Sequence, residues 1–159
     1  MSAPLLDFST GLWAKLLAHL RIQGQGVRES GAFLLGHKNT TERIVTGFLP
    51  YERLQPDALQ EDYVSLSAAS FSRLWSICAE HNLSVVADVH THRFGPQQSR
   101  SDKANPMIAL AGHVALIVPS FAQGNIEIKD IGVHVYRGNH QWQSHFGIHV
   151  PPLINLTRP

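Results

Sequence analysis

The sequence predicts a single mixed α/β domain over residues 1–159, with a β-sheet flanked by helices. Two segments carry apolar residues at helical spacing, and runs of β-branched apolar residues lie between and after them. No internal repeat and no linker composition divides the chain. A chain of 159 residues is long enough to bury one hydrophobic core without disulfides or structural metals. We therefore expect helices and strands that mix along the chain and share one core.

Two amphipathic helices are expected. The first begins after Asp7 or Ser9 and ends in the glycine-bearing segment 22–26. Its apolar stripe consists of Leu12, Trp13, Leu16, Leu17 and Leu20. Ser67 is the candidate cap of the second helix. Its stripe consists of Phe71, Leu74, Trp75 and Cys78.

The strands are expected from apolar and β-branched runs that end at turn residues. Segment 50–62 holds two prolines and is expected to be a loop, as is segment 93–102. Residues 102–112 are expected to form a short helix, and residues 140–159 have no clear pattern. The expected strands are 31–36 and 43–50, joined by a polar turn at 37–41, then 83–92, 113–121, 126–130 and 132–138.

The composition excludes several classes of function. The net charge is +1 and the basic residues are scattered, so a nucleic-acid partner is not expected. Cys78 is the only cysteine, which excludes an intrachain disulfide and a zinc ribbon, and its helical neighbours predict a buried apolar position. No apolar run could span a bilayer and no basic leader begins the chain, so we expect a cytoplasmic protein without a membrane partner.

Among ten histidines, only His90 and His92 stand at a spacing with a clear chemical meaning. Side chains two residues apart on a strand point to the same face, so both imidazoles can reach one metal ion. No role is predicted for His140 or His145. The isolated histidines are expected at the surface or hydrogen-bonded in the core: His19, His37, His113, His134 and His149.

Asp102 is the first carboxylate that follows the histidine pair. Two histidines and one aspartate leave the fourth tetrahedral position of Zn²⁺ for water, which is the pattern of a catalytic site. A metal held in this way lowers the pKa of water and polarises a carbonyl. The alternative is that Asp102 is a first-turn helix residue in a capping arrangement with Ser99, and both roles are compatible.

A metal-dependent hydrolase also needs a general base, and Glu29 is the candidate. It stands two residues before the apolar run 31–36, so it is expected at the edge of the core, where burial can raise the pKa of its carboxyl group. The alternative from local sequence alone is a solvated turn residue, which is the commoner environment of a glutamate.

Three segments together resemble a known motif. E-S-G-A-F-L-L-G (29–36), H-T-H (90–92) and S-R-S-D (99–102) are similar to the JAMM motif of the MPN (Mov34/Pad1-like) zinc metalloproteases. The resemblance extends from Glu29 to Pro119. Arg93 replaces the family's usual proline, and the segment between His92 and Asp102 is one residue shorter than usual in the family.

The resemblance implies an MPN/JAB-like (cytidine-deaminase-like) domain with a curved mixed sheet. It implies that His90, His92 and Asp102 bind one Zn²⁺ per chain and that Glu29 activates water. Ser99 would donate a hydrogen bond to the oxyanion. The implied activity is that of a deubiquitinase-like isopeptidase, which cuts after the extended C-terminal tail of a ubiquitin-like or other conjugated protein. Small bacterial members with such a compact motif occur with E1- and E2-like proteins, some of them in antiviral (antiphage) defence.

Two further functions stay open. A metal-free MPN-type scaffold would only bind partners, and a zinc peptidase could act on free peptides or small amides. An amidohydrolase barrel needs a much longer chain, with the histidine pair on its first strand. A cupin would need a glutamate soon after the pair, and segment 93–101 has none.

Overall fold

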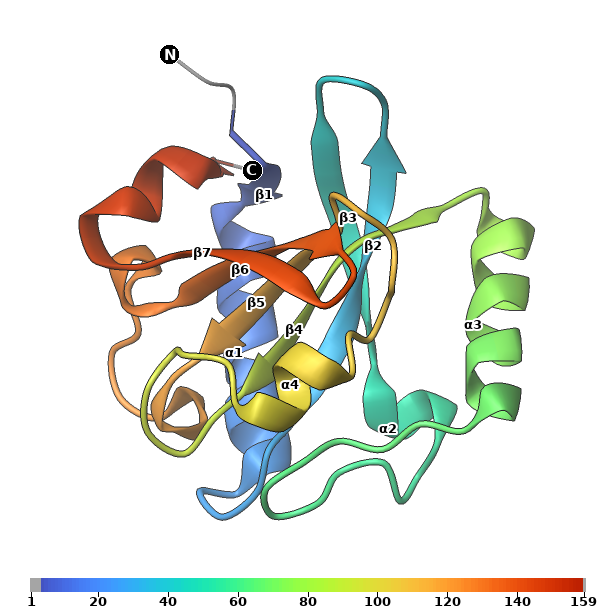
Figure 1. Cartoon of the computed structure of the whole chain (residues 1–159), viewed down its shortest axis with the longest axis horizontal. Coiled ribbons are helices and arrows are strands. Elements are labelled where there is room, and N and C mark those ends of the chain that lie inside the picture. The colour runs from blue at the N-terminus through green and yellow to red at the C-terminus, as the bar shows by residue number, and fades with distance from the viewer. Residues whose placement is uncertain (1–3, 159) are drawn as a thin grey trace.

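The computed structural model describes residues 4–158, whose strands form one curled, eight-stranded mixed sheet (Figure 1). Residues 1–3 and 159 of the expected domain lie outside the described range. The strand order is β7-β6-β5-β4-β2-β3-β1-β8. The strands are β1 (Leu6–Ser9), β2 (Gly31–Lys38), β3 (Arg43–Pro50), β4 (Ser84–Thr91), β5 (Val114–Val118), β6 (Gly132–Gly138), β7 (Gln141–His145) and β8 (Ile154–Thr157).

Within residues 4–158, four α-helices accompany the sheet: α1 (Thr10–Gly24), α2 (Tyr51–Leu54), α3 (Ala68–His81) and α4 (Arg100–Ala104). The side chain of Ser9 accepts a hydrogen bond from the backbone of Leu12 and caps α1, while Ser67 caps α3 in the same way. Both long helices end at a residue in the left-handed conformation, Gln25 after α1 and Asn82 after α3. The two amphipathic helices expected from the sequence are therefore confirmed, with Ser9 rather than Asp7 as the first cap.

The two faces of the sheet are covered by different helices. On one face, Trp13, Leu16 and Leu20 of α1 pack in a core with strand residues that include Leu34 and Val89. On the other face, Leu74 and Cys78 of α3 pack with Phe33, Leu35 and Tyr51. In Figure 1, α1 lies behind the sheet and α4 lies in front of it. The site residues of the next section lie on the face opposite α1.

A β-bulge in β4 determines which face its last residues occupy. Leu34 pairs with Ala87, whereas the next residue of β2, Leu35, pairs with Val85, so Val86 is the extra residue. Val86, Ala87 and Val89 all belong to the core on the α1 side. Because the bulge shifts the alternation by one residue, the side chains that follow at positions 88, 90 and 92 face away from α1.

Several expectations about secondary structure were wrong. Segment 50–62 is not all loop, because α2 forms within it. The helix expected at 102–112 begins at Arg100 and ends at Ala104. Segment 126–130 contains a 3₁₀ turn in place of a strand, since the backbone of Asp130 hydrogen-bonds locally to Glu127. The sequence pattern also gave no sign of β1, β7 and β8, which are short strands at or near the sheet edges.

Within residues 4–158, no helix combines the length and the apolar character needed to cross a membrane. The Cys78 thiol is buried among apolar residues, and this burial raises its pKa. Cys78 is therefore a core residue, as its helical neighbours predict.

Candidate metal centre

The histidine pair lies where β4 ends. The Nε2 atoms of His90 and His92 are 3.0 Å apart, and the two rings meet edge to face. The backbone holds His92 firmly, because its N–H donates to the carbonyl of Val118 and its carbonyl accepts from Phe121. Strand alternation thus brings both imidazoles to one point, as the spacing predicts.

Asp102 reaches the same point from α4. Its Oδ2 lies 3.0 Å from Nε2 of His92 and its Oδ1 lies 3.4 Å from Nε2 of His90. Tetrahedral zinc with bonds of about 2.0–2.1 Å places its ligand atoms roughly 3.3 Å apart. The separations among these three side chains are close to that value, so the donor set fits one zinc ion.

Ser99 and Asp102 form a reciprocal capping box at the start of α4. The Asp102 backbone N–H donates to Ser99 Oγ at 3.0 Å, and the Ser99 N–H donates to Asp102 Oδ2 at 2.8 Å. The capping role that the sequence allows is therefore present. The second bond also orients the Asp102 carboxylate toward the histidines, as partners of metal ligands commonly do.

Glu29 lies on the other side of the histidine pair. It is 9% exposed, and its Oε2 is 3.9 Å from Nε2 of His92. Burial raises the pKa of its carboxyl group, and the nearby His90 and His92 offset part of this effect. A buried position with a raised pKa suits a general base better than the solvated turn that local sequence favours.

The backbone around Glu29 is fixed by three hydrogen bonds. Its own N–H donates to the carbonyl of Gln60 at 3.1 Å. The next residue, Ser30, donates its N–H to Thr91 Oγ1 at 2.9 Å, and its hydroxyl donates to the Leu20 carbonyl. Thr91 is the middle residue of the H-T-H segment, so Glu29 and the histidines share one rigid frame.

Two sets of three candidate ligands therefore share the histidine pair. Glu29, His90 and His92 offer ligand atoms that all lie within 4.8 Å of one another. Asp102 lies closer to both imidazoles than the 3.9 Å that separates Glu29 from His92. The separations of Asp102 match those of a zinc tetrahedron more closely than the distance between Glu29 and His92 does.

The charges of the site stabilise one another. Burial by itself would raise the pKa of Asp102, but hydrogen bonds to His90 and His92 outweigh it and hold the pKa well below its usual range. For His90, burial would lower the pKa, and Asp102 and Glu29 outweigh it and raise the pKa. The negative charges of Asp102 and Glu29 therefore favour a positive charge between them, which either a protonated imidazole or a bound cation can supply.

Two other histidines support the site without entering it. His113 pairs with the buried Asp88 at 2.6 Å, and Asp88 lies on the same face of β4 as His90. His134 donates from Nε2 to the carbonyl of Pro96 and accepts at Nδ1 from Ser144. Pro96 belongs to the loop between His92 and Asp102, so His134 anchors the segment that leads to Asp102. Both histidines are hydrogen-bonded core residues, as expected.

The site opens to solvent through two adjoining hollows that both include Glu29. The smaller has a volume of about 100 Å³ and contains His90, Asp102 and Trp142. The larger, about 340 Å³, is lined by Glu29, Glu61, Asp62, Arg93 and Phe94. Trp142 and Asp62 were not predicted from the sequence, since neither belongs to a recognisable motif. His140 and His145 line neither hollow.

No protein-family model matches the sequence. Among solved structures, the chain is similar to a protein from Desulfitobacterium hafniense, with a TM-score of 0.71 and 15% identity over 97% of this chain and 94% of that one. It is also similar to a protein from Salinibacter ruber, with a TM-score of 0.61 and 17% identity over 96% and 91% of the two chains. At such low identity, these similarities show a shared fold alone.

Proposed function

We propose that the protein is a JAMM-type zinc metalloprotease with an MPN-like domain, in which His90, His92 and Asp102 bind one Zn²⁺ per chain. The observation that carries the proposal is the convergence of these three side chains, with separations of 3.0 to 3.4 Å, beside the buried Glu29. Three protein ligands of the histidine and carboxylate type, with the fourth position left for water, are typical of catalytic rather than structural zinc.

In this proposal, each residue has a separate task. Zinc, when bound, supplies a Lewis acid that polarises the scissile carbonyl and lowers the pKa of water. Glu29 removes a proton from the attacking water and delivers it to the leaving amine. The Ser99 hydroxyl accepts from the Asp102 backbone, so its own proton is free to stabilise the carbonyl oxygen as that oxygen gains charge.

The shape of the site favours an extended peptide as substrate. Two hollows meet at Glu29, so a chain can pass the general base from one side to the other. A small amide would fill only a part of these two hollows. We therefore infer that the substrate is a ubiquitin-like or otherwise conjugated protein, whose C-terminal tail lies across the site. E1- and E2-like enzymes would make the conjugates that this activity removes, as in bacterial conjugation systems with an antiphage role.

The proposal is tested with purified protein, zinc and a panel of ubiquitin-like fusions that differ in their C-terminal tails. Mass spectrometry of the products should show one cut directly after the ubiquitin-like domain, and a chelator should abolish it. Glu29→Gln should also abolish the cut, while Glu42→Gln, on an exposed turn, should leave it unchanged. Cleavage of free peptides but of no fusion would reject the protein substrate and retain the enzyme. A protein that binds no zinc and cuts nothing would be the scaffold.

A further inference from the structure

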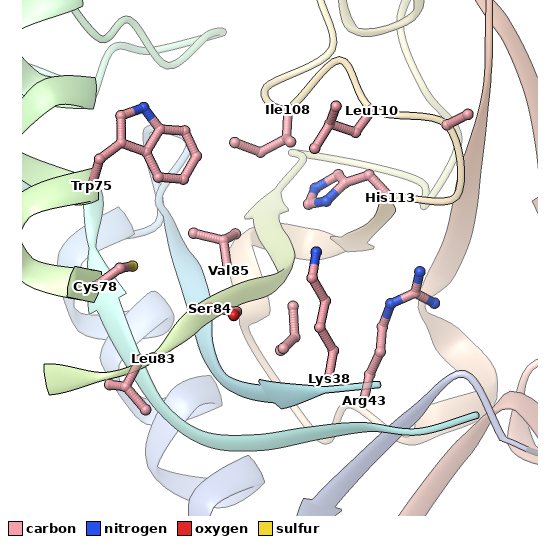
Figure 2. Close-up of a pocket in the computed structure, with 12 residues that line it drawn as sticks. Lys38, Arg43, Trp75, Cys78, Leu83, Ser84, Val85, Ile108, Leu110 and His113 are labelled. Carbon is pink, nitrogen blue, oxygen red and sulfur yellow. The ribbon is translucent and has the colours of Figure 1, made fainter. Parts of the chain in front are cut away.

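A second cavity, of about 320 Å³, lies at the other end of β4 (Figure 2). Its walls come from the β2–β3 hairpin, from α3 and from the segment that follows α4. It shares no lining residue with the two hollows of the candidate metal centre. Ser84 at this cavity and His90 at the metal centre are six residues apart on one strand, which corresponds to about 20 Å. The proposed hydrolase has no use for this cavity.

One end of the cavity is basic. Lys38 and Arg43 enter it from the β2–β3 hairpin, and His113 enters from the opposite wall. In Figure 2, the Lys38 amine points into the space below the His113 ring. None of the described residues that line the cavity is acidic. Within residues 4–158, neither Lys38 nor Arg43 forms an ion pair, so their charges are not neutralised by the protein.

Two hydrogen bonds hold this basic end in place before any ligand arrives. Arg43 donates from Nη2 to the carbonyl of Gly112 at 2.8 Å. The Nε2 atom of His113 is bound to Asp88, which fixes the plane of the ring. A preorganised arrangement lowers the entropy cost of binding an anion, because these side chains lose little freedom.

The other end of the cavity is apolar and unusually exposed. Trp75 is 48% exposed and Leu110 is 63% exposed, and Ile108 lies between them in the wall. The same three residues also line an open apolar groove of about 480 Å³, which continues toward Phe71 and Met107. Large apolar side chains that gather in the open in this way commonly mark a binding site.

We propose that this cavity binds a small organic anion, in which a carboxylate or phosphate group is joined to an apolar body. The charged group lies between Lys38, Arg43 and His113, and the apolar body lies against Trp75 and Leu110. The two halves of the cavity select for both properties at once, since the basic end favours the charge and the apolar end favours the body. The proposal is independent of the hydrolytic function, because it concerns other residues.

The test is an NMR titration of the whole protein with octanoate and octyl phosphate, with acetate and 1-octanol as probes of each half. Both amphipathic anions should shift the signals of Lys38, His113 and the Trp75 indole, and should bind at least tenfold more tightly than acetate or octanol. The tighter of the two anions identifies the charged group as carboxylate or phosphate. Lys38→Glu and Trp75→Ala should each weaken binding at least tenfold.

The matched controls are Lys15→Glu and Ile22→Ala, which alter an exposed lysine and an exposed apolar residue on α1. Both control variants should bind octanoate like the wild type. The proposal is wrong if octanol binds as tightly as octanoate, if Lys38→Glu binds octanoate like the wild type, or if the shifted signals lie elsewhere. Since the titration measures binding and not cleavage, its result is separate from that of the fusion assay.

Discussion

Glu29 and Asp102 are both carboxylates beside the histidine pair, yet their surroundings give them different chemistry. Hydrogen bonds to two imidazoles and to the Ser99 backbone keep Asp102 ionised, as a metal ligand must be. Burial instead raises the pKa of Glu29, which makes it a better acceptor and donor of protons. In the proposed enzyme, these environments suit Asp102 to bind the metal and Glu29 to act as the base.

Glu29→Gln should retain zinc and lose turnover. The amide has nearly the same shape but cannot accept a proton from water, so the rate should fall roughly 10²- to 10⁴-fold. Zinc content and the rate of fusion cleavage are measured on the same sample. A variant that cleaves at the wild-type rate would exclude Glu29 as the base.

Ser99→Ala and Ser99→Gly separate the two roles of Ser99. Both remove the hydroxyl, but glycine is a tolerable cap whereas alanine costs about 1 kcal/mol of stability. If the hydroxyl stabilises the oxyanion, both variants should lose roughly ten- to a thousandfold in rate. Rates and urea unfolding are compared for the pair. A loss of rate in the alanine variant alone would leave only the capping role.

His134 should make the fold sensitive to acid. Burial lowers its pKa to about 4, below the ordinary value of 6.5 in the unfolded chain. The unfolded chain therefore takes up a proton first, and stability falls as the pH falls from 6.5 toward 4, by up to about 3 kcal/mol. Above pH 6.5, the neutral His134 contributes this stability in full.

Urea unfolding of the metal-free protein and of His134→Gln, at about pH 7.5 and about pH 4.5, measures the effect. The variant lacks this titration. Between the higher and the lower pH, its free energy of unfolding should therefore fall less than that of the wild type, by most of the roughly 3 kcal/mol given above. An equal loss of stability in both proteins would show that other groups cause the acid sensitivity.

At the scale of elements, the bulge at Val86 places the histidine pair on the face of the sheet opposite α1. Strand alternation predicts from sequence that His90 and His92 share a face, and the structure agrees. It cannot predict which face, because the bulge depends on the pairing with Leu34 and Leu35, more than fifty positions away in the chain. Local capping made the helices predictable, since Ser9 and Ser67 act on residues only three positions away.

The elements that were missed depend on distant partners. β1 pairs in parallel with β8, at opposite ends of the chain, so neither segment shows its pairing in its own sequence. Segment 126–130 has the alternation of a strand, but Glu127 and Asp130 form a reciprocal capping box that closes a turn. The position of Glu29 is also a tertiary property, because its burial depends on the frame that Thr91 and Gln60 provide.

Gly132→Ala should disturb the loop that leads to Asp102. A Cβ at Gly132 would lie 2.2 Å from the Pro96 carbonyl oxygen and 2.7 Å from Nε2 of His134. The loop must move away, at a cost of about 1–3 kcal/mol. Zinc affinity should fall roughly ten- to a hundredfold as Asp102 shifts.

Gly47→Ala is the matched control for this change, because a Cβ on this β3 glycine would have no neighbour within 4 Å. Competition with a zinc chelator measures both affinities, and urea unfolding measures both stabilities. Equal effects in the two variants would show that the contact between Gly132 and Pro96 has no role in holding the loop.

At the scale of the whole molecule, β4 connects two separate sites. Its C-terminal end carries the histidines of the candidate metal centre, and its N-terminal end lines the basic and apolar cavity. The buried pair of Asp88 and His113 lies between them, since Asp88 lines the metal-centre hollow and His113 lines the cavity.

In the proposed function, one zinc ion binds to His90, His92 and Asp102, with Glu29 beside it. Zinc content per chain, measured by mass spectrometry of the metal on purified protein, tests this directly. The wild type and Glu29→Ala should each hold about one zinc per chain, in keeping with a site of three protein ligands. His92→Ala and Asp102→Ala should hold almost none. A wild type without zinc would show that this is not a zinc site. Zinc that is retained in Asp102→Ala but lost in Glu29→Ala would show that Glu29, and not Asp102, is the third ligand.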